Sequence, residues 1–167
     1  MRPGTSRGLT SGERARLSPG LVAALDEAGI SPVVLNRPHT AARVAALWRG
    51  SPPILARPGQ IFWPGALVDY AEVPAPAFAT LQHELQHLLD YATGAMTGLG
   101  YLLSPADWRY GYQPKENACS DDFGAEQRAT IAEHLWLLEQ GRGDLVGRAL
   151  GREPPSLEWC RRVLPWA

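Results

Sequence analysis

The sequence predicts one α+β domain over residues 1–167, with a small, mostly antiparallel sheet packed against a strong helix and a second helix behind it. The length of 167 residues and an apolar content of 45% are enough for a single hydrophobic core. The 17 glycines and 15 prolines gather in clusters that punctuate the first half, so the strands there must be short. We expect residues 1–17 to be an N-terminal extension and residues 141–167 a C-terminal tail with a short helix.

The first half of the chain predicts one helix and several shorter elements. Ser18 is expected to cap a helix that begins at Pro19 and ends at Gly29, because serine is a favoured cap and proline a favoured first residue. Glycine and proline bound the shorter elements. These are a strand at 33–35, a helix at 40–48, and strands at 54–55 and 60–63 joined by a turn at 58–59.

The strongest helical pattern begins after Pro76 and ends at Gly94. Apolar residues recur there at every third or fourth position and form a continuous stripe, which consists of Phe78, Leu81, Leu85, Leu88 and Ala92. The chain from residue 94 to residue 122 is rich in loops and aromatic side chains. A second strong helix is expected from a cap at Asp121 or Asp122 to about Gln140, and a last short one at 156–163.

The candidate chemistry lies on the first strong helix, in the sequence His83-Glu84-Leu85-Gln86-His87. Residues four apart project from one face of a helix, so both imidazoles can bind one Zn²⁺ ion. Glu84 lies about 100° around the helix from His83 and is placed to act as a general base. Both histidines lie off the apolar stripe, and they are two of only four in the chain. We therefore expect a zinc site here rather than two surface histidines.

A catalytic zinc site needs a third protein ligand, and two carboxylates are candidates. Asp107 lies in residues 107–111, which resemble the D-x-x-Y-G end of the aspzincin signature, although Ser104-Pro105 replaces the expected Gly-Thr. Glu126 lies in the first turn of the second strong helix, where the positive helix end favours a carboxylate. Ala125 and Ala129 beside it allow the two helices to approach closely. We therefore favour Glu126.

Other side chains near the motif have supporting roles or structural ones. Tyr110 and Tyr112 are candidates to stabilise a tetrahedral oxyanion, and aromatic packing is the alternative for both. Asp90 is either an acceptor for an imidazole N–H or an exposed helix acid, and Glu133 is either solvated or placed behind a ligand. The two remaining histidines are expected to be structural, and they are His39 and His134.

A net charge of −1 argues against a nucleic-acid binder and gives no reason to expect a membrane-surface helix. The first residues lack the apolar core of a secretory signal, and no uncharged apolar run is long enough to span a bilayer. We expect a cytoplasmic protein or one exported by a signal-independent route. Cys119 and Cys160 match no zinc or redox pattern, which favours two unpaired thiols, with a single disulfide as the alternative.

Together these residues resemble the small gluzincin-type zincins, which include a bacterial family labelled vgr-related proteins. The resemblance rests on His83-Glu84-x-x-His87 followed by Glu126-Gln127, and it extends to residues 1–13, 60–64, 110–112 and 122–131. It implies a zincin-like α+β fold with three zinc ligands, His83, His87 and Glu126. It also implies that Glu84 is the catalytic glutamate.

The motif and the resemblance point to a zinc-dependent metallopeptidase that hydrolyses a peptide or protein substrate with zinc-activated water. If Ile61–Trp63 forms the sheet edge, an extended peptide can bind by adding a strand beside it. The alternative is a non-catalytic, zinc-stabilised module associated with a secretion or phage-tail apparatus, as the family label suggests. An open fourth zinc position favours the enzyme, and a protein side chain in that position favours the module.

Overall fold

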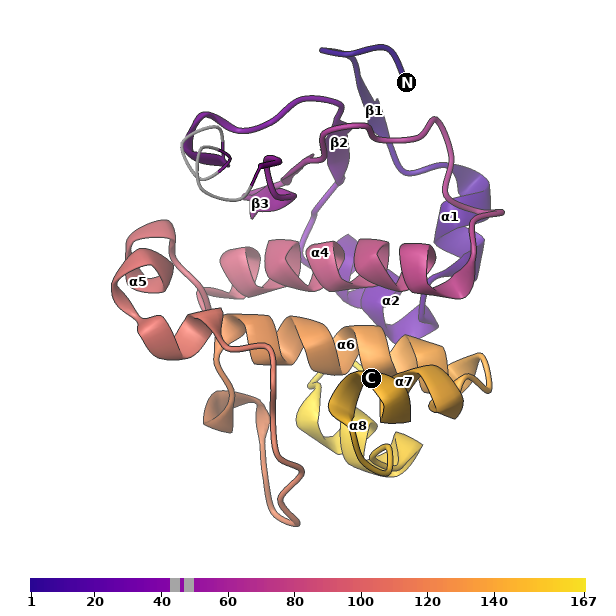
Figure 1. Ribbon diagram of the computed structural model, residues 1–167, viewed down its shortest axis with the longest axis vertical. Helices are drawn as coiled ribbons and strands as arrows, with labels where there is room; N and C mark the ends of the chain where they lie inside the picture. Colours follow the sequence, from indigo (N-terminus) through magenta and orange to yellow (C-terminus); the bar gives the residue numbers. More distant parts are fainter. Residues whose placement is uncertain (43–45, 47–49) are drawn as a thin grey trace.

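The structure is a computed structural model that describes residues 1–42, 46 and 50–167 (Figure 1). A small mixed sheet lies on one side of helix α4 (Ala75–Thr93), and helix α6 (Ala125–Glu139) lies on the other side. Helices α7 (Gly143–Leu150) and α8 (Leu157–Val163) cover the far side of α6. The predicted α+β class is therefore confirmed. Of the helix expected at 40–48, residues 43–45 and 47–49 lie outside the described residues.

The sheet of the described residues has four strands of three residues each, in the spatial order β1 (Ser6–Gly8), β2 (Val33–Leu35), β4 (Gln60–Phe62) and β3 (Leu55–Arg57). The two outer pairs are antiparallel, but the central β2–β4 pair is parallel. The sheet is therefore mixed, with antiparallel pairing at two of its three strand pairs. The β3–β4 hairpin turns at Gly59, whose φ of +70° suits glycine, and docks on β2 with its second strand.

Strand β4 is an inner strand, so the expectation that Ile61–Trp63 forms a sheet edge is wrong. Ile61 is fully buried and Phe62 is 8% exposed, because the strand has a hydrogen-bonded neighbour on both sides and α4 nearby. The outermost strand on this side is β3, which packs against α4. Among the described residues, the free edge that faces the predicted zinc helix is therefore Leu55–Arg57.

The remaining helical elements are short: α1 (Ser11–Arg16), α2 (Pro19–Glu27), α5 (Gly98–Leu103), and the 3-10 turns η1 (Pro105–Trp108) and η2 (Ser120–Asp122). Helix α2 begins at Pro19 as predicted. The Ser18 side chain does not cap α2, since its hydroxyl donates to Glu139 on α6 at 2.7 Å instead. This bond ties the start of α2 to the end of α6.

The interior contains two apolar clusters, one on each side of α6. The larger cluster joins the sheet, α2 and α4, and includes Leu21, Leu25, Ile61, Phe78 and Leu85. The smaller cluster joins α6 to α8, and includes Tyr112, Phe123, Ile131, Leu135 and Trp159. The predicted stripe of α4 is buried from Phe78 to Leu88, so this helix is held rigidly from the sheet side.

Helix α6 begins at the residue before Glu126, and its cap is Gly124 rather than Asp121 or Asp122. Asp122 belongs to the 3-10 turn η2 that precedes the helix. A Cβ at position 124 would lie 2.8 Å from the carbonyl oxygen of Ala106, so glycine is needed for this close approach. The consequence is that Glu126 lies in the first turn of α6, as predicted.

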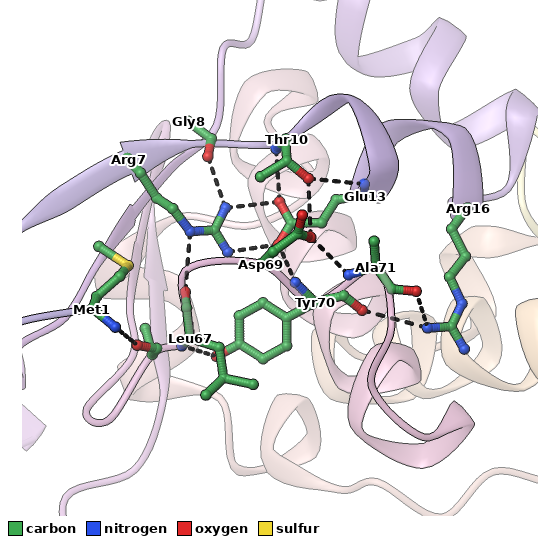
Figure 2. A network of polar contacts seen from close by, with 11 residues as sticks. Met1, Arg7, Gly8, Thr10, Glu13, Arg16, Leu67, Asp69, Tyr70 and Ala71 are labelled. Carbon is green, nitrogen blue, oxygen red and sulfur yellow. Dashed lines mark hydrogen bonds and ion pairs between the residues drawn. The ribbon is translucent and has the colours of Figure 1, made fainter.

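The segment expected to be an N-terminal extension contains β1 and α1, and a polar network fastens it to residues 66–71 (Figure 2). The Glu13 carboxylate is fully buried and accepts two bonds from the Arg7 guanidinium, at 2.7 and 2.6 Å. It also accepts a bond from the backbone N–H of Thr10 and one from that of Tyr70, both at 2.8 Å. The side chain of Arg7 and two backbone N–H groups thus supply four hydrogen bonds to this carboxylate.

Both cysteines are free, which confirms the prediction of unpaired thiols. Cys119 is exposed, whereas Cys160 is buried against α6, and burial raises the pKa of its thiol to about 12. Within the part of the chain that the structure describes, no helix has both the length and the apolar character needed to cross a membrane.

Candidate metal centre

The three predicted zinc ligands come together between α4 and α6. His83 and His87 lie one turn apart on α4, and the Nε2 atoms of both imidazoles point at Oε2 of Glu126, at 3.1 and 3.3 Å. One ligand atom from each side chain lies within 4.8 Å of the other two, and all three residues are buried. This group, called the triad below, could hold a metal ion.

The antiparallel packing of α4 on α6 produces this geometry (Figure 1). Phe78 near the start of α4 stacks on Trp136 near the end of α6, with ring centroids 4.8 Å apart. Asp90 near the end of α4 binds Arg128 near the start of α6, at 2.9 Å. The middle of α4 therefore faces the first turns of α6, where the helix end favours the negative charge of Glu126.

The charges of the triad are coupled. Burial alone would raise the pKa of Glu126, but hydrogen bonds from His83, His87 and Tyr101 hold it far below its usual range. Burial alone would lower the pKa of His83, but its contacts with Glu126 and Glu133 and the nearby charge of Glu84 raise it to about 10. The pocket between the helices therefore stabilises positive charge next to the Glu126 carboxylate.

The Nδ1 atoms of the two imidazoles, which are not the atoms that face Glu126, differ in their partners among the described residues. Nδ1 of His83 lies 3.4 Å from a carboxylate oxygen of Glu133, whose side chain is 28% exposed. Glu133 therefore lies behind a ligand, which was one of its two expected roles. Nδ1 of His87 is buried and has no hydrogen-bond partner among the described residues. Two imidazoles with inward Nε2 atoms and one carboxylate match the donor set of catalytic zinc sites.

Tyr101 is a member of the site that the sequence did not indicate. Its hydroxyl, from α5, donates to Oε1 of Glu126 at 2.6 Å, so Oε2 is left for the two imidazoles. Burial, together with this bond to a carboxylate, raises the pKa of Tyr101 well above its ordinary value. The only signal in the sequence was an aromatic residue in a loop-rich segment, and no spacing rule distinguishes it from its neighbours.

The triad opens onto a cavity of about 400 Å³ between α4, β3 and the α5–η1 segment. Glu84 lines the same cavity, is 7% exposed, and has its pKa raised mainly by burial. Tyr110 also lines it, and its ring stacks on that of His83 with centroids 5.9 Å apart. The cavity therefore brings together the triad and two of the three predicted catalytic side chains, Glu84 and Tyr110.

Tyr112, the third predicted catalytic residue, lies elsewhere. Its ring stacks on Trp159 in the smaller apolar cluster, and its hydroxyl bonds Nδ1 of His134 at 2.8 Å. Both Tyr112 and His134 are buried, and neither lines the cavity. Packing was the alternative for Tyr112, and this is where the structure places it. His39 likewise packs its ring on the edge of Phe62.

The two other acidic candidates have partners outside the triad. Asp107 accepts a bond from the backbone N–H of Ala125 at 2.9 Å and so satisfies the first turn of α6. Asp90 is buried and binds the side chains of Gln86 and Arg128 rather than an imidazole. It therefore links α4 to α6 and is neither an exposed acid nor an imidazole acceptor.

Comparison of the chain with protein-family models, curated proteins and solved structures gives no match. The resemblance to gluzincins therefore stays a prediction. The geometry of the triad and its cavity is what supports a metal site.

Proposed function

We propose that the chain is a gluzincin-type, zinc-dependent metallopeptidase that hydrolyses peptide bonds in a peptide or protein substrate. One observation carries this proposal: the ligand atoms of the triad converge at a cavity that Glu84 also lines. A bound zinc ion would supply a Lewis acid that activates water and polarises a carbonyl oxygen. The cavity beside the triad also supports an open coordination position, which a catalytic site requires.

Glu84 is the proposed general base. Its carboxylate is buried beside the two imidazoles, and burial raises its pKa toward the range in which a carboxylate accepts and returns a proton efficiently. Tyr110, stacked on His83 at the cavity wall, is placed to donate its hydroxyl to the carbonyl oxygen as negative charge develops there. Tyr101 holds Glu126 in position from the opposite oxygen.

The free edge of β3 is the proposed platform for the substrate. All three residues of this strand, Leu55–Arg57, line the cavity, and among the described residues β3 pairs with β4 alone. An extended peptide can therefore continue the sheet beside β3 and bring its backbone across the triad. This replaces the strand Ile61–Trp63, which the order of the sheet makes an inner one.

The test combines zinc analysis with hydrolysis of fluorescently labelled casein. The wild-type protein is expected to bind about one zinc ion per chain and to cleave the casein. Glu84→Gln should keep the zinc and lose at least about a hundredfold in rate, because it removes a base and not a ligand. His83→Ala should lose both. A Glu84→Gln protein as fast as wild type, or a zinc-loaded wild type that cleaves nothing, would favour the non-catalytic module of a secretion or phage-tail apparatus.

A further inference from the structure

Among the described residues, one guanidinium lies in the wall of the cavity, together with acidic side chains. Arg57 ends the free strand β3 and lines the cavity together with Glu84 and Glu126. Its Nη1 donates to the hydroxyl of Tyr91 at 3.3 Å. A guanidinium has five N–H donors, and the described residues offer Arg57 no carboxylate partner. Arg57 therefore brings unused hydrogen-bonding capacity and a positive charge to the cavity.

Two other enclosed arginines of this fold pair with carboxylates, whereas Arg16 binds backbone carbonyl oxygens and aromatic rings instead. The Arg7 side chain, 15% exposed, forms a pair with Glu13 at 2.6 Å. The Arg128 side chain, 8% exposed, forms a pair with Asp90 at 2.9 Å. Arg57 is half-buried, but its only side-chain partner in the described residues is a neutral phenol. A carboxylate that enters the cavity can therefore supply the charged partner that Arg57 lacks among the described residues.

The position of the guanidinium is fixed by two neighbours. Tyr91 lies four residues after His87 on α4, which places it about 6 Å farther along the helix from the triad. Gly98, the first residue of α5, lies so close that a Cβ there would be 3.0 Å from Nη1 of Arg57. The rise along α4 from His87 to Tyr91 corresponds to about two residues of an extended peptide, which advances about 3.3 Å per residue.

We propose that Arg57 binds a carboxylate of the substrate, so that the cavity selects peptides with a carboxylate within about two residues of the hydrolysed bond. The carboxylate is either the C-terminus or an Asp or Glu side chain, and both offer the two oxygens that a guanidinium binds. At the Arg57 end such a group gains a charge-assisted pair, which the acidic side chains Glu84 and Glu126 cannot offer it. The inference rests on the proposed function, because it assumes a peptide lying along β3.

Binding, measured apart from turnover, tests the inference. The zinc-treated Glu84→Gln protein is dialysed to equilibrium against three pools of acetylated pentapeptides made of neutral residues. The first pool is amidated, the second has a free C-terminus, and the third is amidated but carries one Glu. Mass spectrometry of both chambers gives the affinities. A charge-assisted pair in a partly enclosed site predicts at least about tenfold tighter binding of the second or the third pool than of the first.

Variants made in the Glu84→Gln protein assign that difference to Arg57. Arg57→Gln should abolish it and leave binding of the neutral pool unchanged. Gly98→Ala keeps the charge but displaces the guanidinium, so the difference should shrink. Arg109→Gln is the matched control, because Arg109 is exposed between two cavity-lining residues, Trp108 and Tyr110, but does not itself line the cavity. It should keep the full difference, which excludes a simple effect of net charge.

The outcomes separate this inference from the proposed function. Equal affinities for all three pools, or a difference that survives Arg57→Gln, overturn the role of Arg57, even if casein is cleaved. A carboxylate preference that depends on Arg57 supports that role, even if the wild-type protein cleaves no peptide. Whether the second or the third pool binds tighter identifies the source of the carboxylate as the C-terminus or a side chain.

Discussion

Two buried glutamates, Glu13 and Glu126, lie in contrasting surroundings. Glu13 is fully buried and is surrounded by donors that never dissociate: the Arg7 guanidinium and two backbone N–H groups (Figure 2). Glu126 is 6% exposed, and its partners are two imidazoles and a phenol. Burial is therefore almost the same at the two carboxylates, but the chemistry of the donors is not.

The difference explains why one glutamate is structural and the other is a candidate ligand. A guanidinium and a backbone N–H have no lone pair to offer a cation, so the chain itself balances the charge of Glu13. A neutral imidazole has a nitrogen lone pair that can bind a metal ion. The Nε2 atoms of His83 and His87 both face Glu126, so all three side chains can bind the same ion. The type of donor, more than the burial of the carboxylate, distinguishes the structural Glu13 from the candidate metal ligand Glu126.

The sharpest test of the contrast is Glu13→Ala. It leaves the Arg7 charge and two backbone N–H groups without their partner in the interior, so the free energy of unfolding should fall by about 3–5 kcal/mol. Urea denaturation measures this loss. Asp26→Ala is the control, because Asp26 is 57% exposed in its pair with Arg14, and it should cost less than about 1 kcal/mol. Zinc affinity should stay the same in both variants.

Zinc itself should stabilise the fold through the triad. An ion that binds only the folded state at a free concentration of about a hundred times its Kd adds about 2.7 kcal/mol. For a chain of this size that corresponds to a rise in Tm of about 5–10 °C, which a chelator should reverse. His87→Ala should lose the shift, and Glu13→Gln should keep it. A melting curve that is identical after verified metal removal would contradict a site that joins α4 to α6.

Glu126→Ala should act on zinc affinity more than on the fold. Removing a direct ligand is expected to weaken binding by at least about tenfold, since losing a residue that only supports a ligand already costs about 10–100-fold. A competitive chelator titration gives the affinity. Tyr101→Phe removes only the bond to the other oxygen of Glu126, so its loss should be smaller. A larger loss in Tyr101→Phe than in Glu126→Ala would show that the carboxylate is not the ligand.

The parts of the site carried by helices could be predicted from the sequence. The spacing of His83 and His87 fixes their common face on any α-helix, and the placement of Glu126 in a first turn gave the third residue of the group. Tyr101 could not be predicted, because it reaches Glu126 from a separate short helix after a loop. The same limit applies to Tyr112, whose loop turns its ring toward Trp159 instead of the cavity.

The sheet and the N-terminal segment were harder to predict for a related reason. Strands of three residues, such as Val33–Leu35 and Gln60–Phe62, are recognisable by composition, but they are too short to specify which neighbour they pair with. The parallel pairing of β2 with β4 therefore emerged only in three dimensions. Glu13 carries no periodic signal either, and its role depends on Tyr70, which lies 57 residues away along the chain.

Asp107 offers the smallest effect and a direct choice between the two carboxylates that the sequence proposed as third ligand. Its oxygen accepts from the backbone N–H of Ala125, so Asp107→Ala should cost about 1 kcal/mol of stability, as the loss of a helix cap does. Asp107→Asn keeps an acceptor oxygen and should recover most of that loss.

Zinc affinity should stay within a few-fold of wild type in both Asp107 variants, because the Asp107 carboxylate contacts the N-terminal end of α6 and not the imidazoles. If the chelator titration instead ranks Asp107→Ala below Glu126→Ala in affinity, the ligand is Asp107 and the chain belongs with the aspzincin pattern. The two readouts are independent, since loss of a cap lowers the free energy of unfolding equally with and without zinc, whereas loss of a ligand also reduces the stabilisation that zinc adds.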